Sequence, residues 1–217
     1  MAPSWIDMTK LQRHQRYLAN DVRGELGFLI RTAIIACATF YWTAYNRMKC
    51  LIIGIGVARK TAFVGNCIFD RHQMSTIQIG ERCRFASSTY YNLIGVNHNC
   101  VLSTHSETAR IDIGSNCGFS GTVIGAFASI RIGDNVRCGA NTVLTDADWH
   151  LDDPRSGKPR DVVIGDNVWL GVNVVVLKGV TIGDNTLVGA NSVVTNSIPA
   201  NVVAAGSPCK VINALEL

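Results

Sequence analysis

The sequence predicts an all-β fold, a triangular coil of short parallel strands, preceded by a helical segment. Three observations predict the coil: a hexad that recurs about every 18 residues, aliphatic residues spaced six apart, and Gly and Asn beside them. Near-copies of the hexad read IGDNVR at 132–137, IGDNVW at 164–169 and IGDNTL at 182–187. Stacked units of this kind bury a continuous core between neighbours, and the two ends need caps.

The N-terminal segment stands outside the repeat, and we expect a helical segment at 1–55 and the coil with a C-terminal cap at 56–217. Residues 1–60 carry nine Lys/Arg against three acidic residues. The apolar stretch from Leu26 to Tyr45 is interrupted by Arg31, which leaves 32–45 uncharged. That stretch is shorter than the ~20 residues of a spanning helix. We therefore expect the helix to pack on copies of the chain, with peripheral contact to a membrane surface as the alternative.

Each hexad is interpreted as one side of a prism with three sides per turn. Aligned on their first residue, the hexads begin at these positions: Phe63, Ile79, Val96, Ile113, Ile132, Ile164 and Ile182. The intervals are 16, 17, 17, 19, 32 and 18. In the last turns, aliphatic residues follow at spacings of six: Ile164, Leu170, Val176, Ile182, Val188 and Val194.

A smaller inward residue is expected four places after each hexad start. These positions hold Cys67, Cys83, Cys100, Cys117, Val136, Val168 and Thr186. Four of the eight cysteines are thereby explained as buried core residues, and the chain has no Cys-x-x-Cys pair. We expect reduced thiols and no metal site. Gly and Asn at the sharp corners supply positive φ and side-chain-to-backbone bonds.

The interval of 32 contains one turn plus about 14 extra residues, and we expect these, approximately 146–162, to be extruded as a loop. Extruded loops often carry function. This loop holds His150 in the sequence DADWH. A neutral imidazole can take a proton from an alcohol, and a nearby carboxylate can support it. We therefore predict His150 as the general base, with Asp148 as the supporting carboxylate.

A family resemblance rests on two stretches of the chain. IGDNVWLGVNVVVLKGVTIGDNTLVGANSVV and then IPANVVAAGSPCKVI, within 163–212, resemble galactoside and maltose O-acetyltransferases of the hexapeptide-repeat acyltransferase family. DADWH resembles a stretch of surface-polysaccharide O-acetyltransferases. The resemblance covers roughly 60–212 and implies a left-handed coil, a homotrimer, and acetyl transfer from acetyl-CoA to a sugar hydroxyl. The family's catalytic His lies one residue earlier than His150, counted from Ile132.

The resemblance also implies where the two substrates bind. It places acetyl-CoA along these residues: Trp169, Gly171, Val172, Gly189, Ala190, Thr195 and Lys210. The family has polar side chains where this chain has Val172 and Asn196, so two donor contacts are absent here. Lys210 would meet a phosphate, and a backbone amide near Trp169 to Gly171 would stabilise the oxyanion. His98 and Ser120 are candidates for holding the acceptor sugar.

Other functions stay open at this point. Transfer to an amino sugar would make the protein an N-acetyltransferase. A β-helical carbonic anhydrase would need three zinc-binding histidines, and a non-catalytic scaffold would need no His loop. Nothing in the sequence predicts nucleic-acid binding. We expect a cytoplasmic protein of polysaccharide biosynthesis, with the inner face of the cytoplasmic membrane as an alternative location.

Overall fold

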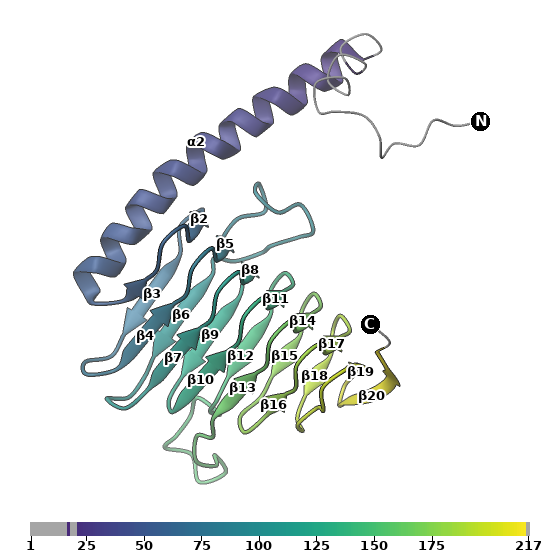
Figure 1. Cartoon of the computed structure of the whole chain (residues 1–217). Coiled ribbons are helices and arrows are strands. Elements are labelled where there is room, and N and C mark those ends of the chain that lie inside the picture. The colour runs from purple at the N-terminus through teal and green to yellow at the C-terminus, as the bar shows by residue number, and fades with distance from the viewer. Residues whose placement is uncertain (1–16, 18–20, 216–217) are drawn as a thin grey trace. The chain divides into compact units, whose positions relative to one another are not determined.

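A computed structural model describes Tyr17 and residues 21–215. The chain forms two compact units, 1–38 and 39–217, and the boundary falls inside helix α2 (Val22–Ile53). Strands that follow the helix stack along the second unit, from β2 near its start to β20 near its end (Figure 1).

Three sheets form the sides of the prism, and the chain visits them in turn. The first sheet holds β1 (Gly56–Val57), β4 (Thr76–Ile79), β7 (Arg110–Ile113), β10 (Ser129–Ile132), β13 (Val162–Ile164) and β16 (Thr181–Ile182). The second holds β2 (Ala62–Val64), β5 (Arg84–Ala86), β8 (Gly118–Ser120), β11 (Arg137–Cys138), β14 (Trp169–Leu170), β17 (Leu187–Val188), β19 (Val202–Gly206) and β20 (Cys209–Ala214). The third holds β3 (Ile68–Arg71), β6 (Val101–Thr104), β9 (Val123–Ala126), β12 (Val143–Thr145), β15 (Val175–Val176) and β18 (Val193–Val194).

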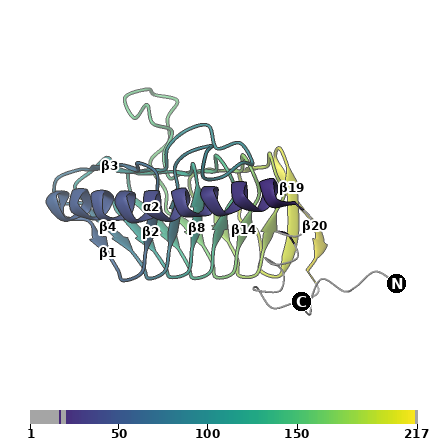
Figure 2. The same cartoon turned by 90° about the horizontal axis from the view of Figure 1, so that it is seen from above.

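Pairing within each sheet is parallel up to β19, so the predicted parallel coil is confirmed. Ile132 pairs with Ile164, and Ile164 with Ile182, one turn apart. The six aliphatic positions spaced six apart, from Ile164 to Val194, are all at most 1% exposed. Figure 2 shows the successive turns side by side, seen from above.

Asn and Gly have different roles at the corners of the coil. Asn135, Asn167 and Asn185 have φ of 59°, 58° and 55°, and their amides bond to one another along the corner. The neighbouring Gly133 is needed for a different reason, because a Cβ there would lie 2.8 Å from the carbonyl carbon of Gly165. Asn therefore supplies the left-handed corner, and Gly allows consecutive turns to approach.

The predicted alignment was wrong for two of its seven hexads. Phe63 lies in β2 of the second sheet, and Val96 lies in a loop before β6. Ile79 and Ile113 are therefore consecutive in the first sheet and 34 residues apart. The excess is a second extruded loop, 88–99, so the loop at 146–161 is not the only large break in the repeat. The two loops leave the coil at different edges (Figure 1).

The same misalignment affects the cysteines. All four are buried as predicted, each at most 1% exposed. They form two pairs at different corners, because Ile68 N–H donates to the carbonyl oxygen of Cys100, and Arg84 N–H to that of Cys117. Cys67 and Cys100 thus share the corner between the second and third sheets, and Cys83 and Cys117 share the corner between the first and second. All eight cysteines are free thiols.

Residues 39–53 of α2 cover the first turn of the coil. The buried Asn46 donates from Nδ2 to the carbonyl oxygen of Gly65 at 3.0 Å and accepts from Cys67 N–H at 3.1 Å. Arg47 donates to the carbonyl oxygens of Ala58 and Thr61. At the other end, β19 and β20 form an antiparallel hairpin. Both ends of the stack are therefore capped by hydrogen-bonded elements.

The exposed surface of α2 is apolar. Within the described part of the chain, α2 has the length and composition needed to cross a membrane. None of the residues in its most apolar 18-residue window is buried. Its exposed large side chains toward the N-terminal end are Val22, Leu26, Phe28, Leu29, Ile30 and Ile34. A partner for this helix, whether copies of the chain or a membrane, stays a prediction.

Candidate functional site

The loop at 146–161 leaves the coil at the corner between the third and first sheets, and a buried carboxylate fixes its base. Asp146, 0% exposed, accepts from the N–H groups of Phe127 at 2.7 Å and Ala128 at 2.8 Å. Burial raises the pKa of Asp146, and these backbone donors oppose the shift. Its carbonyl oxygen accepts from Arg160 N–H at 2.9 Å, which closes the two ends of the loop together.

Trp149 anchors the start of the loop on the third sheet. Its φ is 67°, and its indole N–H donates to Thr145 Oγ1 at 2.9 Å. Its ring lies edge-on to His105 and Phe127, with centroid distances of 4.7 and 5.4 Å. Gly125 makes room for it, because a Cβ there would lie 2.4 Å from Trp149 Cζ2. Trp149, which precedes the predicted base His150, is thus fixed by a hydrogen bond and by contacts with two rings.

His150 has a fixed backbone and an exposed side chain. Its N–H donates to the carbonyl oxygen of Asp148 at 2.9 Å, and its own carbonyl oxygen accepts from Asp153 N–H at 3.1 Å and from the Ser156 hydroxyl. No hydrogen bond to its imidazole occurs within the described part of the chain. The loop therefore presents an exposed imidazole, without a hydrogen-bond partner among the described residues, on a backbone that is fixed in place.

The carboxylate of Asp148 has other partners than His150. It accepts from the Lys178 ammonium and from Gly157 N–H at 3.0 Å. The hydrogen bond from Lys178 is the main reason that the pKa of Asp148 is lowered. Lys178 lies between β15 and β16, one turn beyond the loop. Asp148 thus ties the loop to the coil, and its link to His150 runs through the backbone.

The predicted donor residues are spread over more than one part of the coil. Trp169 lies on the second sheet with 58% of its surface exposed. Gly171, Val172, Gly189 and Ala190 follow β14 and β17, at the corner between the second and third sheets. Thr195 lies at the corner of the His150 loop, and Lys210 lies exposed on β20.

Some backbone amides at that corner are engaged in the coil and others are not. Trp169 and Gly171 donate to the carbonyl oxygens of Thr186 and Val188, at 2.9 and 2.8 Å, so their N–H groups are already used. An oxyanion donor near Trp169 to Gly171 stays a prediction, and it would have to be an N–H group other than those of Trp169 and Gly171. Among the described residues, the N–H groups of Val172 and Ala190, one turn apart, have no hydrogen-bond acceptor. They are the donors that a groove at this corner offers.

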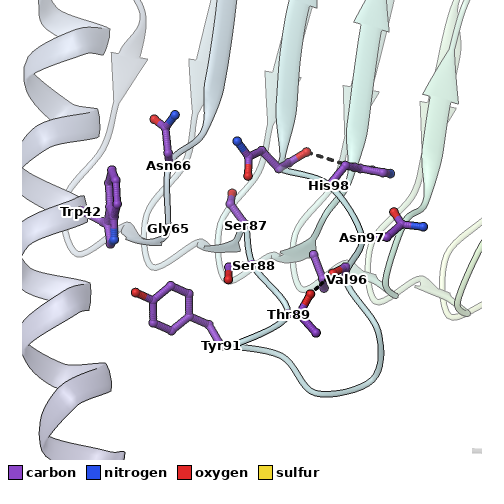
Figure 3. A pocket seen from close by; sticks show the side chains of 11 residues that line it. Trp42, Gly65, Asn66, Ser87, Ser88, Thr89, Tyr91, Val96, Asn97 and His98 are labelled. Atoms are coloured by element: carbon purple, nitrogen blue, oxygen red, sulfur yellow. Dashed lines mark hydrogen bonds between the residues drawn. The ribbon is translucent and has the colours of Figure 1, made fainter.

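Two hollows gather the predicted acceptor residues and several that the sequence did not indicate. One, of about 210 Å³ on the second sheet, brings Ser120 together with Trp169, Arg84 and Arg137. The other, of about 370 Å³, includes His98 and Trp42 from α2 (Figure 3). Both are bordered by Tyr91 from the loop at 88–99. His150 lines neither hollow.

His105 belongs to the surroundings of the loop at 146–161, although the sequence did not indicate it. Its ring stacks on Phe127 at 4.6 Å, and its Nε2 lies 2.9 Å from Ser103 Oγ. Burial lowers the pKa of His105. Its position two residues after Ser103 places both side chains on the same side of the strand, which could have indicated their contact. Its contact with Trp149 could not be predicted, because it depends on how the loop folds back.

The described residues include no group of three or more His, Cys, Asp or Glu placed to hold a metal ion. The histidines that a zinc hydratase would need are dispersed: His98 precedes β6, His105 follows it, and His150 lies in the loop after β12. The arrangement thus gives no support to the hydratase alternative.

Comparison with known proteins identifies the repeat. The family described as bacterial transferase hexapeptide (six repeats) matches residues 161–196. The galactoside O-acetyltransferase of Escherichia coli (strain K12) is 42% identical over 117 residues, which cover 51% of this chain and 57% of that protein. The galactoside O-acetyltransferase of Lactococcus lactis subsp. lactis (strain IL1403) is 37% identical over 139 residues, covering 62% of this chain and 61% of that protein. The chain thus spans about three fifths of the length of these two curated relatives.

Solved structures show the same fold. AntD, an N-acyltransferase from Bacillus cereus solved in complex with dTDP and 3-hydroxybutyryl-CoA, superposes with a TM-score of 0.60. It is 18% identical, and the match covers 78% of this chain and 88% of that chain. The predicted left-handed β-helix is confirmed by this likeness and by the three parallel sheets. The chain carries the hexapeptide repeat of bacterial transferases at residues 161–196 and is similar over its matched part to galactoside O-acetyltransferases.

Proposed function

We propose that the protein is an acetyl-CoA-dependent O-acetyltransferase that acts on a sugar hydroxyl, with His150 as the general base. The observation that carries this proposal is the exposed imidazole of His150 on a loop tied down at Asp146, Asp148 and Trp149. A catalytic base needs an accessible ring on a fixed backbone, and this loop provides both.

His150 would remove the proton of the acceptor hydroxyl as that oxygen attacks the acetyl carbonyl carbon. Acetyl-CoA supplies the acetyl group as a thioester, and the proton leaves with the thiol of coenzyme A. Asp148 is then a positioning residue, since its carboxylate is held by Lys178 and Gly157.

The donor would lie along the corner that follows β14 and β17. The free N–H groups of Val172 and Ala190 fit the carbonyl oxygens of a pantetheine arm, or the oxyanion, at a spacing of about 4.8 Å between turns. Gly171 and Gly189 let consecutive turns approach there, because a Cβ would lie 2.6 Å from Ala190 N at Gly171 and 2.8 Å from Ala205 Cβ at Gly189. Trp169, Thr195 and Lys210 complete the proposed donor set, with Lys210 meeting a phosphate.

The placement of these groups supports a site shared between copies. His150 belongs to the corner between the third and first sheets, whereas Val172 and Ala190 belong to the corner between the second and third. Within one copy, the third sheet separates them. A homotrimer, as is usual in the family, would bring one copy's loop to the next copy's groove.

A hydroxyl acceptor is favoured over an amino group by the relatives. The galactoside O-acetyltransferases match over 117 and 139 residues, whereas an N-acetyltransferase from Lacticaseibacillus paracasei matches over 78 residues. We propose a precursor of a polysaccharide as the acceptor, held in part by His98 and Ser120, and a cytoplasmic location. Contact with the membrane through α2 belongs to the same proposal.

The proposal is tested by measuring coenzyme A release from acetyl-CoA over a panel of acceptors. The panel contains free sugars, nucleotide-linked sugars, lipid-linked sugars and 2-amino sugars. We expect release with hydroxyl acceptors and an ester product that hydroxylamine cleaves. Release only with amino sugars, giving a product stable to hydroxylamine, would replace O-transfer by N-transfer.

A further inference from the structure

The larger hollow lies where α2 meets the second extruded loop. It has a volume of about 370 Å³ and is walled by Trp42 on the helix and Tyr91 on the loop (Figure 3). Asn66, Asn97, His98 and Asn99 contribute polar groups to its lining. It thus combines residues from the helix, the first turn and the loop.

The chemistry of the lining indicates an uncharged, polyhydroxylated ligand. Among the lining residues there is no Asp, Glu, Lys or Arg, and three are asparagines. Amides both donate and accept hydrogen bonds, as neighbouring sugar hydroxyls require. The flat faces of Trp42 and Tyr91 suit the C–H face of a pyranose ring. A phosphate or a carboxylate would find no Lys or Arg among these side chains.

The walls of the hollow are held in place before any ligand binds. Next to Tyr91, Asn92 donates from Nδ2 to Ser120 Oγ at 2.9 Å. On the other side of the loop, Asn97 N–H donates to Asn141 Oδ1 at 3.0 Å. The amide side chain of Asn97 has no hydrogen-bond partner among the described residues. The loop thus offers a free amide on a fixed backbone, which reduces the entropy lost on binding.

The hollow is displaced along the coil from the proposed base. The loop at 88–99 enters β6, and the loop at 146–161 leaves β12, two strands further in the third sheet. Two strand spacings amount to roughly 10 Å along the coil axis. A single pyranose ring held in the hollow cannot also reach the level at which His150 leaves the coil.

We propose that this hollow binds a sugar unit of the acceptor other than the one that is acetylated, so that the acceptor is an oligosaccharide or a larger glycan. The proposal rests on the proposed function for the reaction itself. The reacting hydroxyl lies at His150 of a neighbouring copy, and the bound unit in the hollow fixes the register of the glycan. The preference for long over short acceptors then originates in Trp42, Tyr91 and Asn97.

The test compares short and long acceptors in two series. These are methyl β-D-galactopyranoside against β-1,4-galactotriose, and methyl α-D-glucopyranoside against maltotriose. In one series at least, we expect kcat/KM to be higher for the trisaccharide. Asn97→Ala and Tyr91→Ala should reduce this preference by about tenfold, the effect of losing one good contact. Leu93→Ala, on the same loop but 71% exposed and outside the hollow, should leave it unchanged.

Binding is measured independently by saturation-transfer NMR of the trisaccharides without acetyl-CoA. We expect transfer to the wild-type protein and its loss in Asn97→Ala, with melting temperatures confirming that the variants fold. Equal kcat/KM for short and long acceptors, or a preference that both variants retain, overturns the proposal while acetyl transfer stands. No coenzyme A release with any acceptor, together with undisturbed trisaccharide binding at the hollow, overturns the proposed function alone.

Discussion

His105 lies between Phe127 and Trp149, and its environment makes the loop anchor sensitive to pH. Burial lowers the pKa of His105 below 6.5, His72 adds to this, and Asp70 and Asp146 oppose it. The unfolded chain therefore takes up a proton at a higher pH than the folded protein. The contribution of His105 is complete above pH 6.5 and is lost as the pH falls through the folded pKa. We expect the melting temperature of the wild type to fall more between pH 7 and pH 5 than that of His105→Asn.

The control for this prediction is the difference between the two proteins, because other groups titrate equally in both. Trp149 fluorescence follows the anchor directly, since its ring contacts that of His105 at 4.7 Å. Parallel pH profiles for the two proteins would show that His105 does not titrate in contact with Trp149.

Asp148 and Lys178 form the tie between the loop and the coil, and removing either partner should free the loop. Arg155 in the same loop offers a trypsin site. We expect cleavage after Arg155 to become several-fold faster in both Asp148→Asn and Lys178→Ala, because a partly exposed ion pair of this kind contributes modestly. Acetyl transfer should fall by a similar factor in both variants. A much greater loss in Asp148→Asn than in Lys178→Ala would instead indicate that the carboxylate acts on the imidazole itself.

Individual residues differ in how far the sequence determined their role. The positive φ of Asn135 and Asn167 follows from local chemistry, because Asn tolerates that conformation at a corner. The extrusion of the loop around His150 follows from the repeat length. The partner of Asp148 could not be predicted, because Lys178 is 30 residues away and meets it only after the loop folds back over the next turn. The anchor formed by His105 and Trp149 depends on that same folding.

Within the strands, a column of aromatic rings fills the first three turns of the coil. Phe85 lies between Phe63 and Phe119, with centroid distances of 5.1 and 4.7 Å, and is 0% exposed. We expect Phe85→Ala to lower the free energy of unfolding by about 3–5 kcal/mol, the usual cost of such a cavity. Urea denaturation measures it. Ile68→Ala on β3, where the side chain is 45% exposed, is the matched control and should cost far less.

A loss below about 1 kcal/mol in Phe85→Ala would mean that the turns repack without the central ring. The coil would then not behave as a stack whose turns depend on their nearest neighbours.

At the scale of strands, the sequence predicted the alignment of hexads with strands in one part of the coil and not in another. From β13 to β18, hexads follow without interruption, and every inward residue was placed correctly. Between β4 and β7, the loop at 88–99 adds almost one turn of chain, so the hexad spacing still looks regular. Corners between different pairs of sheets also have similar sequences, as in IGERCR and VNHNCV. An insertion whose length is close to that of the repeat cannot be detected from the spacing of the hexads.

At the scale of the whole assembly, the proposed site requires more than one copy of the chain. Ala190 is exposed beside the proposed groove, so Ala190→Trp should block the donor without a clash inside the coil. We expect Ala190→Trp and His150→Ala to be inactive alone. When the two are unfolded, mixed equally and refolded, activity should return to about a quarter of the wild-type value, because each shared site needs one intact residue from each of two copies.

Sedimentation of the refolded mixture, and of each variant refolded alone, controls for assembly and is expected to show trimers. Assembly into mixed trimers with no recovered activity would place the base and the groove in a single copy.

The most direct measurement of the central claim is the rate of coenzyme A release by His150→Ala at saturating acetyl-CoA and acceptor. Removing a general base usually costs 10²–10⁴-fold. We expect a fall in kcat of about that size, with acetyl-CoA affinity, melting temperature and oligomeric state unchanged. Turnover by His150→Ala at the wild-type rate would contradict the account, because the extruded loop would then carry no base.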